Sequence, residues 1–178
     1  SGRNGARSAW TCWKFIGPLE SCPFHRLALP PKPCAMFTGI ITDIGEITEL
    51  QQRPGADLRA AIRTAYDLES VAIGASIACS GVCLTVVERG GAAGDAWFDV
   101  DLSGETVSRT VPGMWAQGAQ LNIEPSLRLG DELGGHIVTG HVDSVGEVVK
   151  VSQDGDSWHI AIRARAEMSP FIAEKGSI

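Results

Sequence analysis

Beyond position 36, apolar residues recur at every second position in short runs that turn residues interrupt. A period of two puts one row of side chains on a single face of an extended segment, which is typical of a β-strand with one buried face. Neighbouring valines near positions 86 and 149 add β-branched segments, which also favour strands. The alternating apolar residues are Phe98, Val100 and Leu102; Leu121 and Ile123; and Trp158, Ile160, Ile162 and Ala164. These runs predict about six short strands.

Turn-forming pairs such as Pro54-Gly55, Pro112-Gly113 and Asp154-Gly155 separate the runs, and the chain holds 21 glycines and 9 prolines. Only residues 103–109 and 167–172 resemble helical turns. Many short, evenly spaced strands with few helices indicate an all-β fold, and we expect a small six-stranded closed barrel. No run approaches the roughly 18 apolar residues that cross a bilayer, so we expect no membrane partner.

Charge is unevenly distributed along the chain. Residues 1–35 hold five of the 15 Lys and Arg residues but one of the 21 Asp and Glu residues, which leaves ten basic and twenty acidic side chains for the remainder. Nucleic-acid binding needs a basic face, so this acidic body argues against a nucleic-acid partner. The five cysteines are an odd number without a disulfide-like framework, which favours reduced thiols and a cytoplasmic protein.

Residues 1–35 show neither strand nor helix periodicity, and the regular pattern begins directly after Met36, the first methionine. We interpret this stretch as an irregular N-terminal extension that is too interrupted by proline to be a secretory signal. The alternative is a zinc site, although its spacing matches no recurring zinc pattern. Its four ligands would be Cys12, Cys22, His25 and Cys34.

Residues 78–86 read as a strand, a tight turn at Gly81 and a second strand. On that second strand Cys83 and Thr85 share a face, because they are two positions apart. A thiol and a hydroxyl on one wall could hydrogen-bond to, or attack, a bound heterocycle. A small buried cysteine that packs against valine explains the same residues.

Three glycines and two histidines crowd residues 134–143. In an extended chain His136 and His141 face opposite sides, which makes a shared metal site improbable. His141 and Asp143 share a face, so the carboxylate could orient the imidazole as a base. The alternative is that each histidine caps a turn or satisfies a backbone carbonyl.

A polar stretch follows the predicted strand that contains Val100. It reads Asp101, Leu102, Ser103, Gly104, Glu105 and Thr106. Free backbone N–H groups and several hydroxyls at such a junction suit recognition of a polyol or a carbonyl-rich ring. A plain Ser N-cap with Glu in the first helical turn fits equally well.

Together these stretches resemble the riboflavin synthase α-chain family, also called the lumazine-binding domain family. Residues 36–40 (Met-Phe-Thr-Gly-Ile) match the family's start, and residues 81–86 match its G-x-C-L-T-V motif. Residues 134–142 match its G-G-H-x-x-x-G-H-[IV] motif. The resemblance covers residues 36–178.

The resemblance implies two similar six-stranded Greek-key barrels and a C-terminal helix that organises a homotrimer. We expect residues 36–134 and 135–172 to form one lumazine-binding barrel together, and residues 173–178 to begin a second, truncated one. A shift of 101 residues supports a repeat. It places Ala65, Ala72, Ser76 and Ile77 on Ala166, Ala173, Ser177 and Ile178.

The reaction implied by the resemblance is a dismutation of two 6,7-dimethyl-8-ribityllumazine molecules. One donates a four-carbon unit to the other, which gives riboflavin and 5-amino-6-ribitylamino-pyrimidinedione without a metal or redox cofactor. The resemblance also implies lumazine synthase as a protein partner. Without a second barrel, these residues alone are expected to be weakly active or inactive. The alternative function is a non-catalytic lumazine or flavin carrier, since the family includes such binding proteins.

The resemblance also implies which residues meet the substrate. His141 would transfer protons, with Cys83 and Thr85 assisting. The substrate-binding candidates are Thr38, Gly39, Ile40, Cys83, Leu84, Thr85, Asp101, Leu102, Ser103, Gly104, Glu105, Thr106, Gly140, His141, Val142 and Lys175.

Overall fold

The computed structural model describes residues 35–54, 57–92 and 94–176, all within the unit Ala35–Ile178. The expected extension 1–35 and the alternative zinc site lie outside the described residues, apart from Ala35. The elements are β1 (Asp43–Gln52), β2 (Leu58–Thr64), η2 (Leu68–Ser70), β3 (Ser76–Cys79), β4 (Val82–Ala92), β5 (Asp95–Leu102), α1 (Gly104–Arg109), β6 (Gln120–Pro125), β7 (Glu147–Asp154), β8 (Ser157–Arg163) and η3 (Ala166–Phe171). Within the described residues, no helix is long and apolar enough to cross a membrane.

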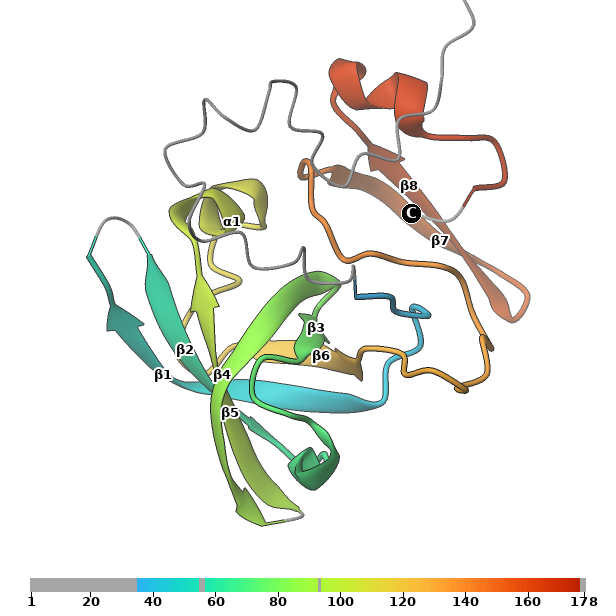
Figure 1. The fold of residues 1–178 in the computed structure, drawn as a ribbon. Coiled ribbons are helices and arrows are strands. Elements are labelled where there is room, and N and C mark those ends of the chain that lie inside the picture. The colour runs from blue at the N-terminus through green and yellow to red at the C-terminus, as the bar shows by residue number, and fades with distance from the viewer. Residues whose placement is uncertain (1–34, 55–56, 93, 177–178) are drawn as a thin grey trace, which may run out of the picture. The chain divides into compact units, whose positions relative to one another are not determined.

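Strands β1 to β6 close into a barrel in the order β1-β2-β5-β4-β3-β6 (Figure 1). All neighbouring strands in it run antiparallel. β2 pairs with β5 rather than with β3, and β3 pairs with β6, which is a Greek-key connection. The predicted six-stranded closed barrel is therefore confirmed, and its closure removes free strand edges.

The apolar row of each barrel strand fills the interior. Phe98, Val100 and Leu102 of β5 are fully buried, and Leu121 and Ile123 of β6 are 1% and 0% exposed. The alternation in these two runs thus marks strands with one buried face, as predicted from the sequence. α1 occupies the first predicted helical turn, and the 3₁₀ helix η3 occupies the second.

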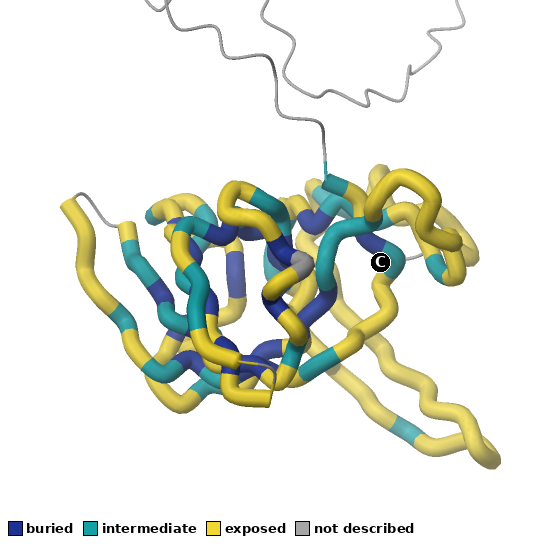
Figure 2. Tube along the Cα trace, turned by 60° about the horizontal axis from the view of Figure 1, so that its bottom comes forward, coloured by how far each residue is buried: buried dark blue, intermediate teal, exposed yellow. Residues whose placement is uncertain are grey.

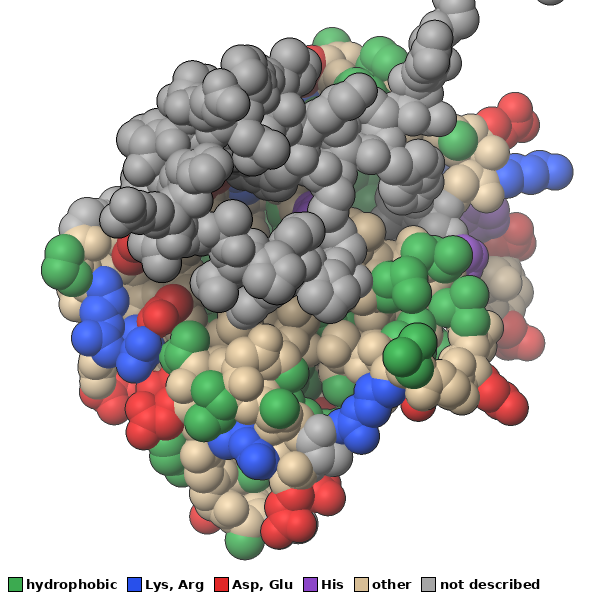
Figure 3. Space-filling view, viewed as in Figure 1, with side chains coloured by type: hydrophobic (Ala, Val, Ile, Leu, Met, Phe, Trp, Pro, Cys, Tyr) green, Lys and Arg blue, Asp and Glu red, His purple; other side chains and the backbone are tan. Residues whose placement is uncertain are grey.

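Charged side chains on the face drawn in Figure 3 are interspersed, with Lys and Arg beside Asp and Glu rather than in one patch. Two ion pairs join neighbouring barrel strands: Arg59–Asp101 at 2.8 Å and Arg63–Glu46 at 2.6 Å. Exposed pairs of this kind contribute about 0–1 kcal/mol each, so barrel stability rests mainly on the apolar interior.

A carboxylate at the start of β1 holds the loop that follows β2. Asp43 accepts hydrogen bonds from the Thr64 hydroxyl and from the backbone N–H groups of Ala65 and Tyr66, the latter two at 2.9 and 3.2 Å. Burial acts to raise the pKa of Asp43, but these hydrogen bonds outweigh it and lower the pKa below its ordinary value of 3.8.

Asp43→Asn is expected to destabilise the protein by about 1–2 kcal/mol at pH 7, because the amide loses the charge that strengthens these hydrogen bonds. A lowered folded-state pKa contributes stability above the unfolded-state value, and that stability is lost as pH falls through the folded-state value. The difference between wild type and variant should therefore shrink below pH 3.8. Urea unfolding from pH 7 to pH 3 measures it, and a difference that does not change with pH would contradict the assignment.

β7 and β8 form a separate two-stranded sheet, called here the C-terminal hairpin. Both of its faces are exposed, including the apolar face that the directly paired residues Val148 and Ile162 share, at 58% and 49% exposure. Figure 2 shows the contrast, with dark blue positions along the barrel strands and a hairpin that is almost entirely yellow. The strand predicted from the alternation at positions 158–164 is present, but the buried face predicted for it is not.

The C-terminal hairpin repeats the pairing register of β1 and β2. Both hairpins carry a bulge at the same point, between Ile47 and Glu49 and, 101 residues later, between Val148 and Lys150. The ion pair Glu46–Arg63 returns as Glu147–Arg163 at 2.8 Å.

The same glycine contact recurs in both hairpins. An added Cβ on Gly45 would lie 2.8 Å from Cγ2 of Ile62, and one on Gly146 would lie 2.7 Å from Cγ2 of Ile162. Both hairpins therefore use glycine where the isoleucine side chain of the paired strand comes close to the backbone.

These observations differ from the expected domain boundaries. We expected residues 135–172 to complete the first barrel, yet that barrel is already closed by β6, which ends at Pro125. Residues 147–163 instead repeat the first hairpin of the barrel. Strand alternation could not reveal this, because it reports which residues form strands and not which strands pair.

Candidate functional site

Three stretches singled out in the sequence meet on the outside of the barrel. Phe37 and Val138 exchange backbone hydrogen bonds of 2.7 and 3.0 Å, and the His136 N–H donates to the Thr38 carbonyl at 2.8 Å. The Cys83 N–H donates to the Gly140 carbonyl at 2.9 Å. The N-terminal motif, the β4 motif and the two-histidine motif are far apart in the sequence. These hydrogen bonds join them into one surface, called here the motif surface.

Two glycines allow this close packing of backbone on backbone. Gly140 has φ +72°, and a Cβ there would lie 2.7 Å from Cβ and 2.9 Å from N of Cys83. A Cβ on Gly135 would lie 2.3 Å from the Thr38 carbonyl oxygen. Both positions thus require a residue without a side chain.

Cys83 and Thr85 lie on the outer face of β4, since the alternate residues Val82, Leu84 and Val86 are buried in the barrel. Burial raises the pKa of the Cys83 thiol, and a hydrogen bond with Ser76 offsets part of this effect. Cys83 is therefore a thiol rather than a thiolate near neutral pH, which suits it to packing and hydrogen bonding more than to nucleophilic attack.

The predicted N-cap at the start of α1 is present. Ser103 Oγ accepts a hydrogen bond from the Thr106 N–H at 3.1 Å, and the Gly104 N–H donates to Asp57 at 3.0 Å. Asp101 forms a bidentate pair with Arg59, at 2.8 and 3.0 Å, which lowers the pKa of the carboxyl. The polar groups of this stretch thus have structural partners, and its recognition of a ligand stays a prediction.

Some predicted site residues have side chains that a surface ligand cannot reach. Leu84 and Leu102 are 5% and 0% exposed and belong to the barrel core, so only their backbone could contact a ligand. Val142 is half-buried against the core, whereas Ile40 is 50% exposed. Lys175 is exposed beyond η3, and no hydrogen bond or ion pair joins it to the rest of the described chain.

His141 and Asp143 are both exposed, and no hydrogen bond joins their side chains. The Asp143 carbonyl accepts a hydrogen bond of 3.2 Å from Arg109, which ties this segment to the end of α1. Gly140 with its positive φ lies between His136 and His141, so the alternation of an extended strand cannot assign the two histidines to opposite faces. The orienting role expected for Asp143 stays a prediction.

Sequence reasoning missed Glu124. Its alternation with Leu121 and Ile123 predicts a solvent-facing side chain, but Glu124 is only 8% exposed, and its carboxylate binds the backbone at Thr38 and Gly39. The contact spans 86 residues. No local pattern signals it, because the same alternation is expected for a solvent-facing glutamate.

A small pocket of about 90 Å³ lies where these segments meet. Phe37, Gly39, Val138 and Glu124 are among the residues that line it. Ligand pockets usually measure roughly 300–1,000 Å³, so this pocket would hold part of a ring system rather than a whole ligand. A complete binding site on this surface requires a further wall.

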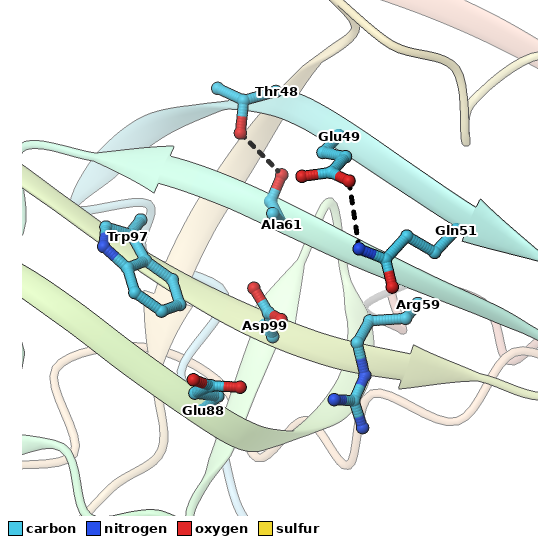
Figure 4. Close-up of a pocket in the computed structure, with 8 residues that line it drawn as sticks. All are labelled: Thr48, Glu49, Gln51, Arg59, Ala61, Glu88, Trp97 and Asp99. Atoms are coloured by element: carbon cyan, nitrogen blue, oxygen red, sulfur yellow. Dashed lines mark hydrogen bonds between the residues drawn. The ribbon is translucent and has the colours of Figure 1, made fainter.

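A larger groove of about 330 Å³ lies on the outer face of β1, β2, β4 and β5 (Figure 4). Trp97 and the carboxylates of Glu49, Glu88 and Asp99 line it with Arg59. Burial, followed by the nearby Glu88, raises the pKa of Asp99. The groove contains none of the predicted site residues. In the described part of the chain, no group of three or more His, Cys, Asp or Glu side chains is arranged to hold a metal.

Comparison with known proteins gives consistent results. Residues 38–126, which span the six-stranded barrel, match the lumazine binding domain family. The chain is 50% identical over 147 residues to the riboflavin synthase of Brucella abortus (strain 2308), covering 80% of this chain and 71% of that protein. It is 38% identical over 144 residues to the riboflavin synthase of Photobacterium phosphoreum, covering 80% and 64%.

Among solved structures, the crystal structure of LumP complexed with riboflavin has a TM-score of 0.62 and 24% sequence identity, and it covers 77% of this chain and 72% of LumP. The structure of LumP with 6,7-dimethyl-8-(1'-D-ribityl) lumazine has a TM-score of 0.60 at 24% identity, covering 74% and 71%. At this identity the likeness concerns the fold.

Proposed function

The chain belongs to the riboflavin synthase family of lumazine-binding proteins, and we propose that it acts in the dismutation of two 6,7-dimethyl-8-ribityllumazine molecules to riboflavin and 5-amino-6-ribitylamino-pyrimidinedione. The observation that carries the proposal is the 50% identity to the Brucella abortus riboflavin synthase over 80% of the chain. The meeting of the three motif segments on one surface supports it.

In this proposal the protein positions two ring systems and moves protons, while the substrate's ring and methyl groups supply the chemistry. Proximity of two bound rings can account for a large part of the rate. His141, exposed at the edge of the motif surface, is the proposed proton-transfer residue. Cys83 and Thr85 form the adjoining wall as neutral hydrogen-bonding groups.

The proposed contact surface has two parts. The first part holds the ring, because its segments converge by backbone hydrogen bonds. It consists of residues 38–40 and 140–142 with Cys83 and Thr85. The second part holds the polyol chain, because the junction between β5 and α1 offers hydroxyls and carboxylates at the surface. It consists of Asp101, Ser103, Gly104, Glu105 and Thr106. Leu84 and Leu102 support both parts from the core.

We also propose that residues from about 139 onward begin a second barrel and that Lys175 belongs to it. The repeated bulge, ion pair and glycine contact of the C-terminal hairpin support this reading. A homotrimer, association with lumazine synthase and a cytoplasmic location remain part of the proposal. Sedimentation analysis of the protein, alone and mixed with lumazine synthase, tests the first two.

The test is incubation of the protein, expressed from its complete gene, with 6,7-dimethyl-8-ribityllumazine while riboflavin absorbance is followed. Formation of one riboflavin for every two lumazines consumed supports the enzyme. Saturable binding of lumazine without riboflavin formation would favour the flavin carrier instead. The observation that favours testing the carrier function is that LumP was crystallised with riboflavin and with 6,7-dimethyl-8-(1'-D-ribityl) lumazine.

A further inference from the structure

Glu124, near the end of β6, is a buried carboxylate beneath the N-terminal motif. Its Oε1 accepts hydrogen bonds from the Thr38 N–H at 2.5 Å and from the Thr38 hydroxyl at 2.8 Å. The Gly39 N–H lies 3.2 Å from Oε1 and 3.1 Å from Oε2. Three donors of two successive residues therefore converge on one carboxylate.

Two successive backbone N–H groups that point the same way form a concave site for an anion. Here the anion is supplied by the protein itself, since Glu124 fills the site that Thr38 and Gly39 create. The positive φ of Gly39, +81°, lets the backbone turn in this manner. The Thr38 hydroxyl also accepts a hydrogen bond from the Ile40 N–H at 3.2 Å, which extends the order to the next residue.

The ends of this segment are held by backbone hydrogen bonds. The Leu127 N–H donates to the Met36 carbonyl at 2.8 Å, and the Thr42 N–H donates to the Ile123 carbonyl at 3.0 Å. Between them, Glu124 is the side chain that fixes residues 38–40. The Thr38 carbonyl in turn accepts a hydrogen bond from the His136 N–H, so Glu124 also helps to position the two-histidine segment.

We propose that Glu124 is a positioning residue that fixes residues 38–40, and through Thr38 the segment 136–140, in the conformation that binds the lumazine or flavin ring. This inference rests on the proposed function, because it concerns the same surface. Glu124 acts through the backbone that it holds and is not itself placed against the substrate.

Two substitutions separate charge from shape. Glu124→Gln keeps the size, but its NH₂ group would face the Gly39 N–H that now donates to a carboxylate oxygen 3.1 Å away. Glu124→Asp keeps the charge and withdraws the carboxylate by one methylene. In Glu124→Gln two hydrogen-bond donors, the new NH₂ group and the Gly39 N–H, face each other. We therefore expect the larger loss of ligand affinity from Glu124→Gln and a smaller loss from Glu124→Asp.

Asp43→Asn is the matched control. Asp43 also accepts from one threonine hydroxyl and two backbone N–H groups, but it holds the loop after β2. A purely structural carboxylate should lower stability when it is replaced, with unchanged ligand affinity.

The experiment measures riboflavin and 6,7-dimethyl-8-ribityllumazine affinity by fluorescence titration, together with the thermal midpoint and amide hydrogen exchange at Thr38 and Gly39. For Glu124→Gln we expect about tenfold weaker binding of both ligands and faster exchange at these two amides, and in turnover a raised KM with kcat changed less. Glu124→Asp should lie between the Gln variant and wild type. Asp43→Asn should keep wild-type affinity.

Two failures are distinguishable. If wild type binds both ligands and Glu124→Gln binds them equally well, or loses affinity only in proportion to a stability loss that Asp43→Asn shares, the positioning role is wrong and the proposed function stands. If wild type binds neither ligand, the proposed function is wrong and the positioning role falls with it. Should Glu124→Gln not fold, the comparison of Glu124→Asp with Asp43→Asn decides by the same criteria.

Discussion

Replacement of His141 by alanine is expected to lower the rate of riboflavin formation by roughly 10²–10⁴-fold, the usual loss for a positioned general acid–base group. Affinity for 6,7-dimethyl-8-ribityllumazine should change far less, because the ring surface formed around Thr38, Cys83 and Gly140 is retained. His141 is exposed and has no hydrogen-bond partner among the described residues, so its removal should leave the thermal midpoint nearly unchanged. Steady-state kinetics, ligand titration and calorimetry of the variant measure the three quantities.

His136→Ala is the control in the same segment. His136 is also exposed, and the contact that it makes with Thr38 is through its backbone N–H, which alanine keeps. Its turnover should stay within a few-fold of wild type. The assignment of the proton-transfer role is wrong if His136→Ala loses turnover and His141→Ala does not.

Gly140→Ala is expected to abolish measurable flavin binding and to destabilise the protein by about 3 kcal/mol or more. Two effects add. An L-residue at φ +72° costs roughly 1–2 kcal/mol, and the new Cβ would lie 2.7 Å from Cβ of Cys83, so the segment must move away from β4. That movement breaks the Cys83–Gly140 hydrogen bond and separates two walls of the motif surface. Denaturant unfolding and riboflavin titration measure the two losses.

Gly113→Ala is the control that separates the cost of a positive φ from the cost of a steric clash. Gly113 has φ +82°, and a Cβ there would meet no atom within 4 Å. It should cost about 1–2 kcal/mol and leave flavin affinity unchanged. If the two alanine variants lose equal stability and Gly140→Ala still binds riboflavin, close packing at Cys83 is not what the site requires.

The barrel strands could be predicted from the sequence because each carries its own evidence. The alternation around Val100 and Ile123 reports a buried face directly, and both residues lie in the core. The same pattern around Ile160 gave the strand correctly, but its side chain is 58% exposed. Burial of a strand needs partners on its faces, and partners are a property of the whole sheet rather than of the strand's own sequence.

The candidate site was partly predictable for a similar reason. Cys83 and Thr85 share an outward face, as their spacing of two requires within a regular strand. The opposite faces expected for His136 and His141 assumed a regular strand that the left-handed Gly140 interrupts. Glu124 escaped notice because its partners, Thr38 and Gly39, lie 86 and 85 residues away. Pairwise contacts at that separation leave no trace in a local pattern.

The shared register of the two hairpins has a consequence for how the chain folds. β1–β2 and β7–β8 are local pairings that can form early, and each presents the same bulge and the same Glu–Arg pair. A nascent chain therefore carries two hairpins of the same register, and the later hairpin could compete for the position of the earlier one, within one molecule or between two. Such exchange is a characteristic misassembly of tandem repeats. Synthesis from the N-terminus opposes it, because the first barrel can close before its competitor has left the ribosome.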